Sequence, residues 1–166
     1  MNIQNYAVLL NKRKATYFLR LMIVIIGIGT LAFCIFALPA IWKEGSAEFP
    51  MASYAVILIV IVMYATAIPF FIGLWHTLKL LNYIDHDKAF SDLSVKALQN
   101  ITWCATIIAI LYICGVPLLF PIAQADDAPG LIIVGTVIAC IPTAVAVFTS
   151  ILQKLLKEAI KIKLVN

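Results

Sequence analysis

Four stretches of the chain carry no charged side chain, and each is long enough to cross a lipid bilayer. They run over residues 21–41, 51–75, 101–125 and 128–152, with charged residues between them. A helix needs about 20 residues to span the hydrocarbon core. The stretches are continuously apolar rather than alternating with period two, which disfavours a β-barrel. The sequence therefore predicts an all-α fold, a polytopic membrane protein with four transmembrane helices in a bundle.

The composition excludes the soluble alternatives. Of the 166 residues, 64% are hydrophobic and 12% are charged, whereas a soluble domain is roughly half apolar and a quarter charged. A small domain also leaves about a third of its unfolded surface exposed. A soluble enzyme, a protein that binds nucleic acid directly and a disordered tail are therefore excluded. We expect one membrane domain over residues 1–166, with the first stretch kept as a helix because its 21 residues exceed a signal-peptide core.

The basic residues predict the orientation. If the N-terminus is cytoplasmic, the inner segments hold 11 of the 12 Lys and Arg residues, and the outer loops hold only Lys43. This asymmetry is the positive-inside pattern, so we expect both termini to be cytoplasmic. Trp42, Trp75 and Trp103 fall near the predicted membrane boundaries, where aromatic rings prefer to lie.

The spans lack the residues on which membrane catalysis and ion coupling depend. They contain no Asp, Glu, Lys, Arg or His, and such groups are the usual carriers of chemistry at depth. Their cysteines have no metal-ligand spacing and are interpreted as packing residues. We therefore predict no enzyme activity, no cofactor and no metal site. The cysteines are Cys34, Cys104, Cys114 and Cys140.

Two acidic clusters lie outside the spans. Asp126 and Asp127 form a carboxylate pair on the short outer turn, which could hold a cation or a basic peptide. The plainer interpretation, which we favour, is a solvated turn near the N-terminus of the fourth helix. On the inner side, Asp85, His86 and Asp87 are adjacent in sequence, and adjacent residues rarely converge on one metal ion without further ligands.

Small residues predict where the helices meet. Gly135, Ala139 and Thr143 recur at four-residue spacing in the fourth span, and small residues let helix backbones approach closely in lipid. We interpret this row as packing within the four-helix bundle, with a homodimer face as the alternative. Prolines inside three spans tend to kink the helices and could open a small apolar pocket. They are Pro69, Pro117, Pro121 and Pro142.

The predicted cytoplasmic face has two organised segments. The inner loop, residues 76–100, contains Ser91 as a helix N-cap. The helix after it would run along the inner interface, with a stripe formed by Phe90, Leu93, Ala97, Leu98 and Ile101. The C-terminal segment, residues 153–166, is a basic amphipathic helix end that suits anionic lipid headgroups. The more specific alternative is that a protein partner docks on both segments.

These segments also carry a family resemblance. The run from Ile84 to Leu98 (IDHDKAFSDLSVKAL) and the turn from Asp126 to Gly130 (DDAPG) resemble the bacterial family DUF2975. Members look like four-helix membrane proteins, often encoded beside a very small helix-turn-helix regulator. The resemblance implies a multi-pass protein of the bacterial inner membrane and supplies no catalytic residues.

From these features we expect a regulatory or sensory membrane subunit that binds a small cytoplasmic helix-turn-helix regulator. The alternatives are a small transport or immunity protein for a peptide or hydrophobic compound, which would use Asp126 and Asp127, and an accessory subunit of a larger complex. The partner-binding residues expected under the first hypothesis are Asp85, Asp87, Phe90, Ser91, Lys96, Lys157 and Lys161.

Overall fold

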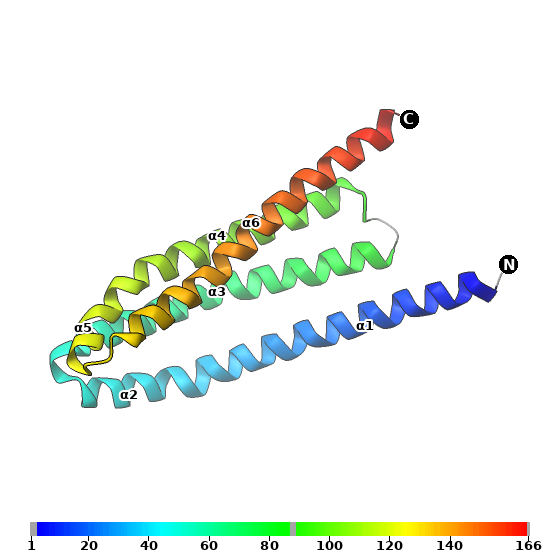
Figure 1. Ribbon diagram of the computed structural model, residues 1–166. Helices are drawn as coiled ribbons and strands as arrows, with labels where there is room; N and C mark the ends of the chain where they lie inside the picture. Colours follow the sequence, from blue (N-terminus) through cyan, green and yellow to red (C-terminus); the bar gives the residue numbers. More distant parts are fainter. Residues whose placement is uncertain (1–2, 87–88, 166) are drawn as a thin grey trace.

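The computed structural model describes residues 3–86 and 89–165, with side chains for 15–86, 89–163 and 165. This part of the chain is entirely helical apart from short turns (Figure 1). The elements, in order, are α1 (Ile3–Ala32), the π-helix η1 (Phe33–Ala37), α2 (Leu38–Glu48), the 3₁₀-helix η2 (Pro50–Ala52), α3 (Ser53–Asp85), α4 (Asp92–Gly115), the 3₁₀-helix η3 (Val116–Leu118), α5 (Leu119–Ala125) and α6 (Gly130–Val165).

These elements form four long apolar rods that run up and down. The stretches Ala15–Glu48, Pro50–Asp85, Asp92–Ala125 and Gly130–Lys163 are each long and apolar enough to cross a membrane. The prediction of four apolar helices is therefore confirmed. Both termini lie at the same end as the α3–α4 connection, and the α2–α3 and α5–α6 turns lie at the other end (Figure 1). We call the first of these the terminal end and the second the turn end.

The helices extend further at the terminal end than the sequence pattern suggested. Within the segment 76–100, α3 continues to Asp85 where a loop was expected, and the helix expected after Ser91 begins at Asp92. Ser91 caps α4, as predicted, because its side-chain oxygen accepts a hydrogen bond from the Ser94 amide at 3.4 Å. No separate interfacial helix precedes the third span, since α4 is one unbroken helix from Asp92 to Gly115.

The rods pack as an open row and not as a closed bundle. The most extensive contacts join α3 to α4 and α4 to α6, while α1 packs on α3. Among the described residues, α1 and α6 share no extensive contact, and Figure 1 shows α1 at one edge of the molecule. Because α4 lies between two helices, it buries Ser94 and Val95 together with Ala97 and Leu98. Of the predicted stripe, Ala97 and Leu98 are buried, whereas Phe90 and Leu93 are exposed.

The packing face of α6 differs in part from the predicted row of small residues. Gly135 and Ala139 face inward, and the Leu119 side chain of α5 occupies the space that a Cβ on Gly135 would need. Thr143 is exposed, and the inward face continues instead through Ala146 to the buried Thr149. With the half-buried Pro142 included, these inward residues are spaced alternately four and three apart, as expected for helices that pack at a small crossing angle. The predicted row, which repeats strictly every four residues, rotates away from this inward face along the helix.

Proline interrupts two of the four rods. Pro39 follows the π-helix η1 in the first rod, and Pro117 lies in η3, where the third rod changes from α4 to α5. Pro69 and Pro142 lie inside α3 and α6, which continue through them as α-helices.

Candidate functional site

An apolar groove opens at the terminal end, between the last turns of α3 and α6. Its volume is about 350 Å³. The start of α4 forms its floor, because Leu98 is buried there between the two flanking helices. We call this the terminal groove. It is lined by Leu80, Ile84, Ala89, Phe90, Leu98, Leu152, Leu155, Leu156 and Ala159.

The length of the helices places this groove beyond the predicted hydrocarbon core. α3 has 33 residues and is about 50 Å long at 1.5 Å per residue, whereas the core is about 30 Å thick. Trp75 and Trp103 are 61% and 62% exposed and mark one level on α3 and α4. The groove begins with Leu80, just over one turn beyond Trp75. Apolar side chains at this level therefore come in addition to the roughly 20 residues that each helix needs to span the hydrocarbon core.

Of the residues predicted to bind a partner, only Phe90 lines the groove, with 60% of its surface exposed. Ser91 acts as the helix cap described above. Asp85 is engaged within the chain, because its Oδ2 atom lies 3.7 Å from Nη2 of Arg20 on α1. Asp87 lies outside the described residues.

The three predicted lysines do not join Phe90. At 100° per residue, Lys157 and Lys161 lie roughly 150–190° around α6 from the centre of the groove-lining stripe. Lys96 lies on the side of α4 opposite Leu98 for the same reason. The structure therefore does not bring these three lysines to the groove that Phe90 lines. Within the C-terminal segment, Leu155 and Leu156 line the groove, whereas Lys154, Lys157 and Lys161 do not.

The outer acidic pair forms a helix stop. The Ala128 amide donates to the Ala123 carbonyl oxygen at 2.9 Å, and Asp127 between them has φ = 49°. This is the Schellman arrangement, in which the residue after the C-cap is left-handed. Asp tolerates that conformation better than most residues. Both carboxylates are exposed, and the described residues include no group of three or more side chains that could hold a metal ion.

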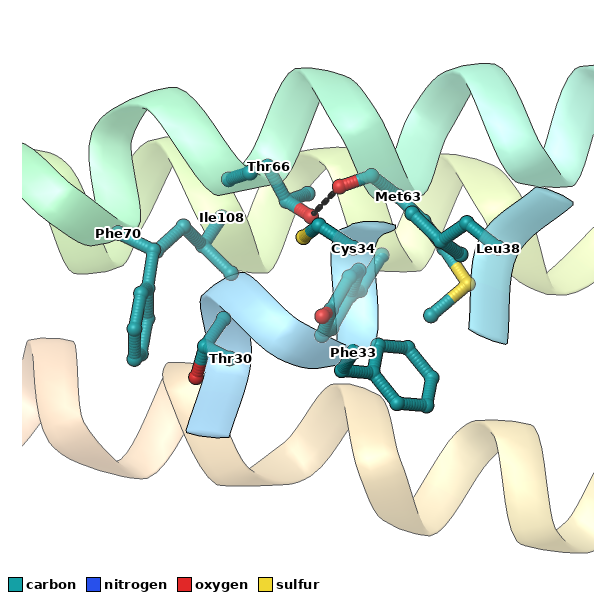
Figure 2. A pocket seen from close by; sticks show the side chains of 10 residues that line it. Thr30, Phe33, Cys34, Leu38, Met63, Thr66, Phe70 and Ile108 are labelled. Atoms are coloured by element: carbon teal, nitrogen blue, oxygen red, sulfur yellow. Dashed lines mark hydrogen bonds between the residues drawn. The ribbon is translucent and has the colours of Figure 1, made fainter. Parts of the chain in front are cut away.

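A second cavity, of about 190 Å³, lies beside the π-helix within the membrane-spanning part. Figure 2 shows Thr30, Phe33, Cys34 and Leu38 of the first rod facing Met63, Thr66 and Phe70 of α3, with Ile108 of α4 behind. The Thr66 hydroxyl donates to the Met63 carbonyl oxygen at 2.8 Å. The sequence indicated that kinked helices could open a small apolar pocket, but it placed neither cavity, because each depends on which residues of separate helices meet.

Comparison with known proteins identifies the family. The family model described as "Protein of unknown function (DUF2975)" matches residues 43–164. The chain belongs to the DUF2975 family. This member is also similar to "Uncharacterized membrane protein YoaS" of Bacillus subtilis (strain 168), with 49% identity over 154 residues, 93% of this chain and 96% of that protein. No solved structure matches it.

The two cavities of this DUF2975 member differ in whether their lining residues fall within the range that the family model matches. Every residue that lines the terminal groove falls within residues 43–164. The cavity beside the π-helix takes Thr30, Phe33, Cys34 and Leu38 from the stretch before the matched range. The terminal groove is therefore built entirely from the matched part of the chain, as is a smaller hollow beside Gly135.

Proposed function

We propose that this membrane protein is a non-catalytic regulatory subunit whose terminal groove binds a small cytoplasmic helix-turn-helix regulator. The observation that carries the proposal is the groove itself, an apolar hollow on the terminal-end side of Trp75 and Trp103. The resemblance to families encoded beside such regulators supplies the partner class.

The orientation is part of this proposal. The terminal end carries most of the basic residues, and the turn end carries Lys43 with Glu44, Glu48, Asp126 and Asp127. The positive-inside rule therefore places the terminal end, with both termini, in the cytoplasm of a bacterial cell. A fusion of green fluorescent protein after Asn166 should fluoresce, whereas a fusion in the turn at Ala128 should not. The opposite result would remove a cytoplasmic partner from consideration.

The shape of the groove suits the apolar face of a helix. Its walls are two roughly antiparallel helix ends, and its lining is made of Leu, Ile, Phe and Ala side chains. An amphipathic helix docks in such a groove through side chains three and four residues apart. Phe90 is the large aromatic residue at its edge and is the expected anchor of the interface.

The test is co-purification with the helix-turn-helix protein encoded next to this chain. We expect the wild-type protein to retain that regulator in detergent, and the variant Phe90→Ser/Leu155→Ser to retain at least tenfold less. Both residues are exposed, so the variant should still fold. Leu93→Ser/Ile162→Ser is the matched control, because these residues are also exposed, on α4 and α6, but do not line the groove. Equal retention by the two variants would refute the groove as the site.

The cavity beside the π-helix favours a second candidate, the handling of a small hydrophobic compound within the membrane. An apolar cavity of about 150 Å³ in a protein can bind a benzene-sized guest, and this one is of similar size. If this is the function, Ala67→Phe should fill the cavity and abolish resistance or transport of the compound, with the terminal-groove variant unaffected.

A further inference from the structure

A third hollow lies between α1 and α3 near the tryptophan level of the terminal end. Its volume is about 300 Å³, and its lining divides into two kinds of side chain. Val24 and Leu78 are aliphatic, whereas Arg20, Lys79 and Asn82 carry hydrogen-bond donors. Trp75 completes the lining. The hollow therefore has an apolar part and a cationic part, as a lipid has a chain and a headgroup.

The two helices meet on one side of this hollow and diverge across it. A Cβ placed on Gly27 of α1 would lie 2.9 Å from Cδ2 of Leu74 on α3, so the helices touch at this level. The next turns toward the terminal end place Val24 and then Arg20 opposite Leu78 and Asn82, where the hollow opens. Beyond it, the Arg20–Asp85 ion pair of 3.7 Å joins the helices again.

The charges at the hollow sum to one positive charge. Arg20 and Lys79 contribute two, and Asp85 removes one. The Arg20 side chain lines the hollow and is 41% exposed, and a guanidinium carries more N–H donors than the one nitrogen that lies 3.7 Å from Asp85 can use. The Lys79 Nζ atom lies 5.6 Å from the centre of the Trp75 ring, which holds the ammonium beside the hollow.

We propose that this hollow binds one anionic phospholipid, with its phosphate on Arg20 and Lys79 and an acyl chain along Val24 and Leu78. A phosphodiester carries one negative charge and neutralises the single positive charge of the site. Basic pockets between membrane helices are known to receive such headgroups. Because α3 is the long helix with which α1 makes its extensive contacts in the described part of the chain, a lipid in this position also fills the gap between them.

The experiment measures lipid retained by the full-length protein. Protein in micelles that contain equal amounts of phosphatidylglycerol and phosphatidylcholine is analysed by native mass spectrometry. We expect one phosphatidylglycerol to be retained in preference to phosphatidylcholine. Arg20→Gln/Lys79→Gln should lower its affinity about 25-fold, since each basic residue near an anionic lipid contributes about fivefold. Excess inorganic phosphate should not displace the lipid, and displacement would indicate a free-anion site instead.

Two further variants keep the proposal falsifiable. Lys157→Gln/Lys161→Gln removes the same charge from the same end of the molecule but away from the hollow, and it should keep the bound lipid. An equal loss in this control would show diffuse attraction and overturn the site. Asp85→Asn should raise the affinity about fivefold by leaving the hollow with two positive charges, a gain that misfolding cannot produce. Unchanged or weaker retention in Asp85→Asn would count against the assignment.

Discussion

The phenol hydroxyl of Tyr64 donates a hydrogen bond to the main-chain carbonyl oxygen of Cys34, over 2.9 Å. In the π-helix η1, the Leu38 amide already donates to the Phe33 carbonyl oxygen, five residues back. With the same five-residue spacing, the Cys34 carbonyl oxygen would accept a hydrogen bond from the amide of residue 39. Residue 39 is a proline and has no N–H group. Tyr64 of α3 therefore supplies the hydrogen bond that the first rod cannot make for itself. An unpaired carbonyl is costly in hydrocarbon.

The first prediction concerns this hydrogen bond. Tyr64→Phe should lower the free energy of unfolding by about 1 kcal/mol, as for other hydrogen bonds between membrane helices. Titration with sodium dodecyl sulfate in mixed micelles measures this change. In a Pro39→Ala background the main chain regains an N–H group at residue 39. Tyr64→Phe should then lower the free energy of unfolding by clearly less. An equal cost in both backgrounds would show that Tyr64 acts through packing alone.

The second prediction concerns the contact between α4 and α6. The Thr102 hydroxyl lies 3.0 Å from the Thr149 hydroxyl, and Thr149 in turn donates to the Val145 carbonyl oxygen at 2.8 Å. Thr102→Val and Thr149→Val in a double-mutant cycle should give a coupling free energy of about 0.6 kcal/mol. Thr136→Val is the control, because the Thr136 hydroxyl bonds only within α6, to Ile132. A coupling of zero would mean that the two hydroxyls do not interact in the folded protein.

The third prediction concerns Gly135, whose missing side chain leaves room for Leu119. Gly135→Ala should force Leu119 to move and lower the free energy of unfolding by about 1–3 kcal/mol. Adding Leu119→Ala should make the glycine substitution nearly neutral. Gly29→Ala provides the reference, since nothing lies within 4 Å of a Cβ at that position. Equal effects of the two glycine substitutions would refute the close approach of α5 and α6.

The fourth prediction separates a backbone role of Asp127 from a ligand role. Because Asp127 has φ = 49°, Asp127→Gly should preserve or raise stability, whereas Asp127→Val should lower it by about 1–2 kcal/mol. Asp126→Val should have a much smaller effect, since Asp126 has a negative φ. Thermal unfolding in detergent compares the three variants. If Asp127→Gly instead abolished binding of a cation or peptide while stability was unchanged, the carboxylate would have a ligand role.

The sequence by itself determined that the chain forms four apolar helices, because each uncharged stretch is long enough to satisfy its own backbone hydrogen bonds in lipid. Local chemistry also determined the Ser91 cap and the amphipathic division of α6, since a cap depends on one side chain and its neighbours and a helix face depends on a fixed rotation per residue. These features need no knowledge of where another helix lies.

The tertiary structure decided which apolar faces meet and which stay open. Nearly every residue in the spans is hydrophobic, so the pattern does not mark the side that packs, and the inward face of α6 runs to Thr149 and not to Thr143. The same limit hid the terminal groove, the pairing of Asp85 with Arg20 and the bond from Tyr64 to Cys34. Each of these joins residues on different helices, and only their packing brings the atoms within reach.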